Sequence, residues 1–119
     1  MLDVRELVKV SKVLSDETRI RMLKLLLEKD ICLCEMEHIF NLSESQISRN
    51  LNMLMNAGFL KRWRDGRCVV YVADRATSNE FCRTFLDLLA RSLNDNDEVN
   101  KDRAKLQQVI ADQVREKCK

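Results

Sequence analysis

The stretch LSESQISRNLNMLMNAGFLKRWRDGRCVVYV, residues 42–72, decides the fold of this 119-residue chain. Ser43 followed three residues later by Gln46 is typical of a capping box, so a helix should begin here. Gly58 stands where a helix over about 43–57 should end. The helix is followed by Asp65-Gly66 between two β-prone runs, which predicts a hairpin.

The rest of the chain is predicted to be helical. Apolar residues at helical spacing predict further helices over about 3–14, 33–40, 77–93 and 98–117. Another helix is predicted after a cap at Ser15 or Asp16, with a buried stripe of Ile20, Leu23 and Leu27. The helices over about 33–40 and 43–57 are joined by a tight turn and followed by the hairpin. This arrangement makes a winged helix-turn-helix, whose second helix enters the DNA major groove. The fold class is therefore mainly α with a small β-hairpin. We divide the chain at the polar break after residue 93, into a DNA-binding and dimerisation domain (1–93) and a C-terminal helical extension (94–119).

Composition indicates a globular protein of the cytoplasm. Apolar residues make up 45% and charged residues 34%. The longest apolar runs fall far short of the roughly 20 residues that span a membrane, so no membrane partner is expected. Acidic residues interrupt the N-terminal segment MLDVRELVKV, which therefore does not resemble a signal peptide. An odd count of five cysteines without a secretion signal argues against a disulfide framework.

The helix over about 43–57 is the one expected to enter the major groove, and we call it the reader helix. Its polar and basic residues, with those of the hairpin, are the candidate DNA contacts. Five basic and two acidic residues between Ser43 and Tyr71 give a local excess of three positive charges. Asn and Gln pair with adenine, Arg with guanine or phosphate, and Ser with phosphate. The candidates are Ser43, Ser45, Gln46, Ser48, Arg49, Asn50, Arg62, Arg64 and Arg67. The alternatives are a solvated helix face and a charged edge strand; Trp63 and Tyr71 are expected to pack rather than to stack on bases.

Several segments resemble the ArsR/SmtB family of metalloregulators. Residues 14–23, LSDETRIRML, resemble the family's "LsDpTRlrIL", and residues 31–36, ICLCEM, its "lCVCdL" box. Residues 42–51 resemble "LsqstvSrHLk", with Asn50 where His is common, and the segments around Gly58 and Asp65-Gly66 resemble the wing "aGLv…reGr". The resemblance covers residues 5–90.

The resemblance implies a transcriptional repressor rather than an enzyme. It implies a homodimer built from the first and last helices that binds double-stranded operator DNA without a cofactor. It also implies release of the DNA when a metal or metalloid ion binds, and we expect As(III) or Sb(III) as inducer.

Cys32-Leu33-Cys34 is the expected ion site. Thiolates favour soft ions, so cadmium, zinc and copper(I) are also chemically plausible. Residues i and i+2 of a helix point about 200° apart, so two helical thiolates could not hold one ion. We therefore expect chelation to unwind the first turn of the helix over 33–40 and thereby to displace the reader helix.

The third ligand stays open at this stage. Family arsenic sensors often carry a third cysteine three residues after the second, where this chain has Glu37. The candidates are Cys118, Cys68, Cys82, or an exogenous thiol or hydroxide. A packing or surface role is favoured for each of Cys118, Cys68 and Cys82, and Cys118 is retained as the candidate third ligand. His38 could pair with Cys34 in a zinc or copper site, although a surface role is favoured.

Three other functions compete with the metalloid repressor. One is a repressor that responds to cadmium or zinc, and another is a repressor that responds to oxidation of Cys32 and a second thiol. The third, from a different class, is a winged-helix protein-interaction module that has lost DNA binding.

Overall fold

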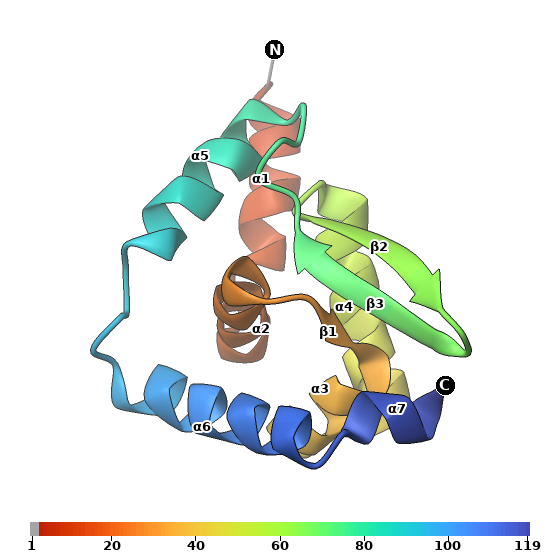
Figure 1. The fold of residues 1–119 in the computed structure, drawn as a ribbon. Helices are drawn as coiled ribbons and strands as arrows, with labels where there is room; N and C mark the ends of the chain where they lie inside the picture. Colours follow the sequence, from red (N-terminus) through yellow and green to blue (C-terminus); the bar gives the residue numbers. More distant parts are fainter. Residues whose placement is uncertain (1–2) are drawn as a thin grey trace.

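The computed structural model describes residues 3–119 and contains the predicted helix-turn-helix, which lies next to the hairpin (Figure 1). The helix-turn-helix consists of α3 (Leu33–Phe40) and α4 (Glu44–Ala57). Asn41 ends α3 in a left-handed conformation, with φ of 52°. Ser43 caps α4 and forms the predicted capping box with Gln46, and Gly58 ends the helix with φ of 101°. The helix predicted from the sequence over about 43–57 is confirmed.

The predicted hairpin forms the wing. Strands β2 (Leu60–Asp65) and β3 (Cys68–Ala73) pair antiparallel, and Gly66 supplies the positive φ of 65° that the turn requires. A third strand, β1 (Ile31–Cys32), pairs with the other edge of β3, giving the order β1-β3-β2. The sequence analysis missed β1 because two residues are too short to display a β periodicity.

Three further helices surround this unit: α1 (Val4–Val13), α2 (Glu17–Glu28) and α5 (Glu80–Ala90). The side chains of Asp3, Asp16 and Asn79 each accept a backbone N–H and cap these helices. The core is continuous across α2, α3, α4 and α5. Its fully buried members include Met22, Leu23, Leu25, Leu26, Met36, Ile39, Ile47, Leu51, Leu54, Phe59 and Leu86.

The C-terminal part folds back along the helix-turn-helix. A single helix over 98–117 was predicted; the structure instead has α6 (Asp97–Ala111) and α7 (Val114–Cys118). Gln113 is left-handed, with φ of 53°, and breaks the helix so that Val114 packs into the core. In Figure 1, α6 runs below α2 and α3, and α7 ends beside the wing tip. The division of the chain at residue 93 stays a prediction.

Two polar contacts anchor this C-terminal part. Arg21 of α2 donates to both carboxylate oxygens of Asp102 on α6, at 2.9 and 2.7 Å. The buried ammonium of Lys24 donates to the Leu89 and Ala90 carbonyls and to the Asn94 side chain, which fixes the chain where it leaves α5. Burial lowers the pKa of Lys24. These contacts join α2 to both ends of the α5–α6 connection.

Within residues 3–119, none of the helices is both long and apolar enough to span a bilayer. Met1 and Leu2, which open the segment interpreted as unlike a signal peptide, lie outside the described residues.

Candidate functional site

Four of the five cysteines gather at the start of α3. The Sγ atoms of Cys32 and Cys34 lie 3.3 Å apart, and those of Cys32, Cys34 and Cys68 all lie within 4.8 Å of one another. Cys118 of α7 is joined to Cys34 by a disulfide. We call Cys32, Cys34, Cys68 and Cys118 the thiol cluster. It brings together three parts of the chain: the helix-turn-helix, the wing and the C-terminal helix.

The expectation that the two sulfurs of the CxC segment face apart is wrong. Cys32 is not helical; it is the N-cap of α3, with extended φ and ψ of −89° and 163°. Only Cys34 lies within the helix, so the 100° rotation per residue does not apply across the pair. The two sulfurs therefore converge without any unwinding, and the predicted loss of the first turn on chelation has no geometric basis.

Glu35 ties the thiol cluster to the C-terminal helix. Its Oε1 accepts the Cys32 backbone N–H at 2.8 Å and also two guanidinium bonds from Arg115. Burial tends to lower the pKa of Arg115, but hydrogen bonds and charge from Glu35 and Asp30 outweigh it and raise the pKa. A buried carboxylate oxygen that accepts three hydrogen bonds thus holds both the cap of α3 and the position of α7.

The Cys32 thiol is protonated at neutral pH. Burial raises its pKa to about 12, and the nearby Glu35 carboxylate adds to the shift. Any ion that binds Cys32 as a thiolate must therefore displace a proton.

The spacing of the sulfurs fits a soft cation. A tetrahedral ion with metal–sulfur bonds of about 2.3 Å separates its sulfur ligands by roughly 3.8 Å. The observed separations, from 3.3 Å up to at most 4.8 Å, bracket that value. Changes of up to about 1 Å in the distances between the sulfurs would bring them to the spacing around one ion, provided that Cys34 is in its reduced form.

The structure places the other candidate ligands, Cys68, Cys82 and His38, in three different surroundings. Cys68 was expected to have a packing or surface role rather than to be a ligand; it is buried, and its sulfur lies within the thiol cluster. Cys82 is buried elsewhere, where its Sγ donates to the Ala57 carbonyl at 3.2 Å and burial raises its pKa to about 11. The Nδ1 of the exposed His38 lies 2.8 Å from the Cys34 carbonyl oxygen, so the ring is bonded to the backbone of its own helix.

The predicted reading face of α4 is mostly open to solvent. Ser43, Ser45, Gln46 and Arg49 are exposed, and Ser48 and Asn50 are half-buried. The Gln46 Oε1 accepts from both the backbone and the hydroxyl of Ser43, so this oxygen is engaged in the cap. Arg49 is the one charged residue among these six predicted contacts, and it is exposed.

Asn50 is held by a residue that the sequence analysis missed. Arg19 of α2 donates from Nη1 to the Asn50 Oδ1 at 3.0 Å and from Nε to the Val13 carbonyl at 2.6 Å. Bidentate pairing with adenine needs both the oxygen and the nitrogen of an Asn side chain. Asn50 would therefore have to leave Arg19 to read a base. A contact between residues 31 positions apart leaves no signal in the local sequence pattern.

The wing presents its arginines as predicted. Arg62, Arg64 and Arg67 are exposed, and Arg62 reaches back to the Asn52 side chain of α4 at 3.5 Å. Trp63, which was expected to pack, is 44% exposed on β2, whereas Tyr71 is buried as expected. Alternation along β2 places Trp63 and Arg62 on opposite faces of the sheet, so Trp63 lies away from the arginines.

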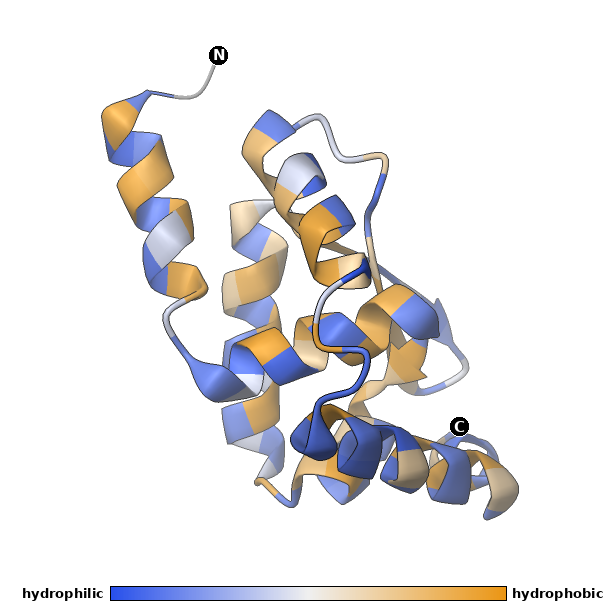
Figure 2. Ribbon diagram, turned by 90° about the vertical axis from the view of Figure 1, so that its left-hand side faces the viewer, coloured by the Kyte–Doolittle hydropathy of each residue, from blue (hydrophilic) through white to orange (hydrophobic). Residues whose placement is uncertain are grey.

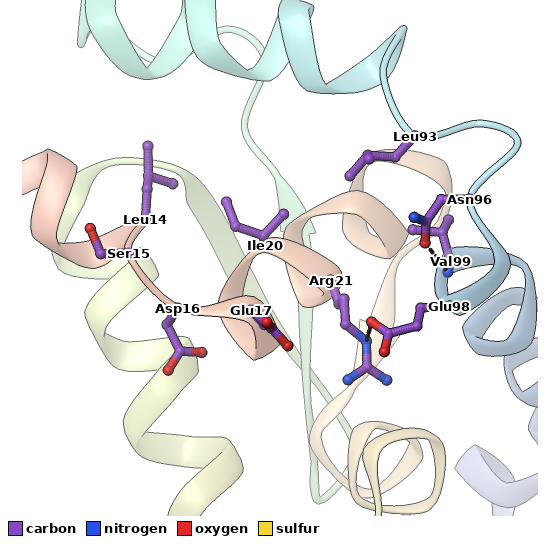
Figure 3. Close-up of a pocket in the computed structure, with 10 residues that line it drawn as sticks. All are labelled: Leu14, Ser15, Asp16, Glu17, Ile20, Arg21, Leu93, Asn96, Glu98 and Val99. Carbon is purple, nitrogen blue, oxygen red and sulfur yellow. Dashed lines mark hydrogen bonds and ion pairs between the residues drawn. The ribbon is translucent and has the colours of Figure 1, made fainter.

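A separate pocket of about 370 Å³ lies between the start of α2 and the α5–α6 connection (Figure 3). Its lining combines Leu14, Ile20 and Val99 with the carboxylates of Asp16, Glu17 and Glu98. In Figure 3 Arg21 points toward Glu98, 4.0 Å away. None of the five cysteines lines this pocket, so it is separate from the thiol cluster.

Comparison with known proteins gives the family. Residues 16–62 match the model of the bacterial regulatory proteins of the arsR family. The HTH-type transcriptional regulator Rv0081 of Mycobacterium tuberculosis is 33% identical over 92 residues, which cover 76% of this chain and 81% of that protein. The chain belongs to the ArsR family.

Other ArsR-family relatives carry names that refer to ions. The arsenic resistance transcriptional regulator ArsR1 of Pseudomonas putida is 44% identical over 63 residues, or 52% of this chain and 49% of that protein. A CadC homolog of Staphylococcus aureus, named for cadmium resistance, is 36% identical over 70 residues, 58% of each chain. The chain thus spans about half the length of these curated relatives. They are transcriptional regulators rather than enzymes.

Solved structures of the family confirm the winged helix-turn-helix. The crystal structure of Rv0081 matches with a TM-score of 0.56 at 32% identity, covering 74% of this chain and 89% of that one. The Mycobacterium bovis domain Mb0332, described as homodimeric, matches with a TM-score of 0.62 at 18% identity, covering 78% and 82%. At 18% identity, the match to Mb0332 shows a shared fold and nothing more.

Proposed function

We propose that this ArsR-family chain is a transcriptional repressor that binds operator DNA as a homodimer in the cytoplasm. It leaves the operator when As(III) or Sb(III) binds cysteine thiolates, with Cys32 and Cys34 as ligands. The observation that carries the proposal is the convergence of these two sulfurs, 3.3 Å apart, at the first turn of the helix that packs against the reader helix.

DNA binding would use the predicted residues of α4 and the wing. The N-terminus of α4, capped by Ser43, presents backbone N–H groups and a positive dipole end to phosphate. Arg49 follows one turn later, and the exposed Arg62, Arg64 and Arg67 extend the basic surface along the wing. This arrangement suits a helix in the major groove with the wing on the adjacent backbone or minor groove.

Exposed apolar side chains support the homodimer. Val4, Leu7 and Val8 on α1 are 81%, 39% and 48% exposed, and Leu88 on α5 is 50% exposed. The two helices stand at the end of the molecule that carries the N-terminus, and hydrophobic residues run along both (Figures 1 and 2). Pairing of α1 and α5, the first and last helices of the predicted dimerisation domain over 1–93, with a second copy would remove this apolar surface from water.

Ion binding would act on the DNA surface through α3. Chelation draws the cap residue Cys32 and the helical residue Cys34 onto one ion. Because α3 packs against α4, a shift of its first turn moves the reader helix relative to the wing. A coupling of about 1–3 kcal/mol is typical of such linkage between two sites.

Response to a thiol oxidant is the second candidate, and the Cys34–Cys118 disulfide favours it. The sequence-based version of this hypothesis had Cys32 as the oxidised residue, whereas Cys32 keeps a free thiol beside the disulfide. Oxidation would use Cys34 and thereby remove one ligand of the ion site.

Release of operator DNA by different inducers tests the function. Fluorescence anisotropy of a labelled fragment from upstream of the chain's own gene would be followed with arsenite, antimonite, cadmium and peroxide. We expect release by the trivalent ions under reducing conditions, and its loss in Cys32→Ser and Cys34→Ser. Release by cadmium alone would favour the cadmium alternative, and release by peroxide that a reductant reverses would favour the redox alternative. No binding of the fragment even at low salt would support an interaction module.

A further inference from the structure

The wing places a third sulfur, that of Cys68, beside the two sulfurs of the CxC segment. Cys32 pairs with Val70 across the β1–β3 edge, and Cys68 lies two residues before Val70 on β3. Residues two apart on a strand face the same side, so Cys32 and Cys68 share one face of the sheet. Both are buried and pack with Val70. The register of the sheet, rather than a flexible loop, thus places the Cys68 sulfur beside the CxC pair.

We propose that Cys68 is the third thiolate ligand, so that the inducing ion links the start of α3 to the wing. This inference rests on the ion site of the proposed function and adds its ligand set. The three sulfurs come from the cap of α3, its first turn and strand β3, all within 4.8 Å of one another. Three thiolates suit a soft, thiophilic cation.

The disulfide with Cys34 gives Cys118 a different role from Cys68. Cys118 lies at the end of α7, next to the C-terminal residue, and reaches the cluster through its disulfide with Cys34. While that bond exists, Cys34 has no thiolate to offer. The oxidised protein therefore lacks one of the three ligands, although Cys32 and Cys68 remain free thiols.

Reduction must precede ion binding. Two equivalents of a small thiol cleave the Cys34–Cys118 bond by exchange, leaving two protein thiols and one disulfide of the small thiol. The ion then binds Cys32, Cys34 and Cys68, and each thiol gives up one proton to solvent. No electrons move in this second step.

The ligand set has a direct consequence for DNA binding. Cys68 pairs with Asp65 at the base of the wing turn and follows Arg67 in sequence. Contraction of the three sulfurs onto an ion would pull this end of the hairpin toward α3. The wing arginines would then move relative to α4, so the two DNA-contacting elements lose their common geometry.

Cadmium binding to the reduced protein tests the ligand set without DNA. X-ray absorption of the Cd²⁺-loaded wild type should count three protein sulfurs, and Cys68→Ala should leave two. Because even outer-sphere partners of a metal contribute roughly 10–100-fold to affinity, Cys68→Ala should weaken Cd²⁺ by about 100-fold or more. Cys82→Ala is the matched control, since Cys82 is also buried but lies outside the thiol cluster. This variant should keep three sulfurs and wild-type affinity.

The outcomes separate this inference from the proposed function. Cys68 is not the third ligand if Cys68→Ala still shows three sulfurs and unchanged affinity. The same conclusion follows if Cys118→Ser shows only two sulfurs. Either result holds even if ions still release the DNA. The wild type could instead show three sulfurs that depend on Cys68 while no ion releases the protein from its operator. That result would uphold the ion site and refute the repressor mechanism. The wild-type sulfur count needs no variant, so a folding defect in Cys68→Ala would not remove the test.

Discussion

Arg115 and Cys32 are joined through a single carboxylate oxygen. The guanidinium of Arg115 donates to the Glu35 Oε1 at 2.9 and 3.1 Å, and the backbone N–H of Cys32 donates to the same atom at 2.8 Å. The side chain of Glu35 is 5% exposed, so this contact is largely removed from water. The C-terminal helix is therefore joined to the cap of α3 by this contact in addition to the Cys34–Cys118 disulfide.

Arg115→Ala should destabilise the reduced protein by about 3 kcal/mol, because it leaves the buried Glu35 carboxylate without its charged partner. Chemical denaturation under reducing conditions measures the free energy of unfolding. The control is Arg75→Ala, since Arg75 and Asp87 form an ion pair whose side chains are both more than half exposed. Its loss should cost less than about 1 kcal/mol. Equal effects of the two substitutions would contradict the role assigned to Glu35.

Arg64→Ala and Arg67→Ala should weaken operator binding and flatten its salt dependence. Each lost phosphate contact lowers the slope of log affinity against log salt by about 0.9. Anisotropy titrations at several salt concentrations measure both quantities. Lys101→Ala removes an exposed charge from α6, away from the wing, and should leave the slope unchanged. An unaltered slope in both arginine variants would remove the wing from the DNA interface.

The helix-turn-helix and the wing could be predicted because their signals are local. The capping box at Ser43, Gly58 at the end of α4 and Asp65-Gly66 in the turn each act within a few residues. The thiol cluster could be predicted only as far as Cys32 and Cys34. The position of Cys68 depends on the pairing of β1 with β3, which brings together residues about 40 positions apart, and on a strand of two residues.

The error about the direction of the two sulfurs has the same origin. Helical spacing was applied to Cys32, which lies one position before the helix predicted over 33–40 and is an extended N-cap in the structure. A shift of one residue at a helix end is ordinary, yet here it decides whether two sulfurs diverge or meet. The break at Gln113 was missed because a left-handed glutamine carries no sequence signal of the kind that glycine gives.

The stability of the reduced protein should fall between about pH 9 and 11, partly because of Cys82. Its pKa is raised from 9.0 to about 11 in the folded state, so the unfolded chain ionises first and alkali favours unfolding across this range. The contribution reaches at most about 1.4 kcal/mol per pH unit for one proton. Denaturation curves of wild type and Cys82→Ala should therefore converge as the pH rises. A constant difference between the two would show that Cys82 ionises equally in both states.

Oxidation should produce one specific linkage. Peptide mapping without reduction, after mild treatment with peroxide, should recover Cys34 joined to Cys118, with Cys32, Cys68 and Cys82 as free thiols. In Cys118→Ser the Cys34 thiol should stay available for alkylation under the same treatment. Recovery of Cys32 joined to Cys34 as the main product would instead favour a redox site confined to the CxC segment.

The most direct test of the account follows the operator complex of Cys32→Ser/Cys34→Ser under reducing conditions while arsenite is added. The double variant should bind the operator with the affinity of the wild type and remain bound at arsenite concentrations that release the wild type. Dissociation of both proteins at the same arsenite concentration would contradict the account, since the signal would then not pass through these two sulfurs.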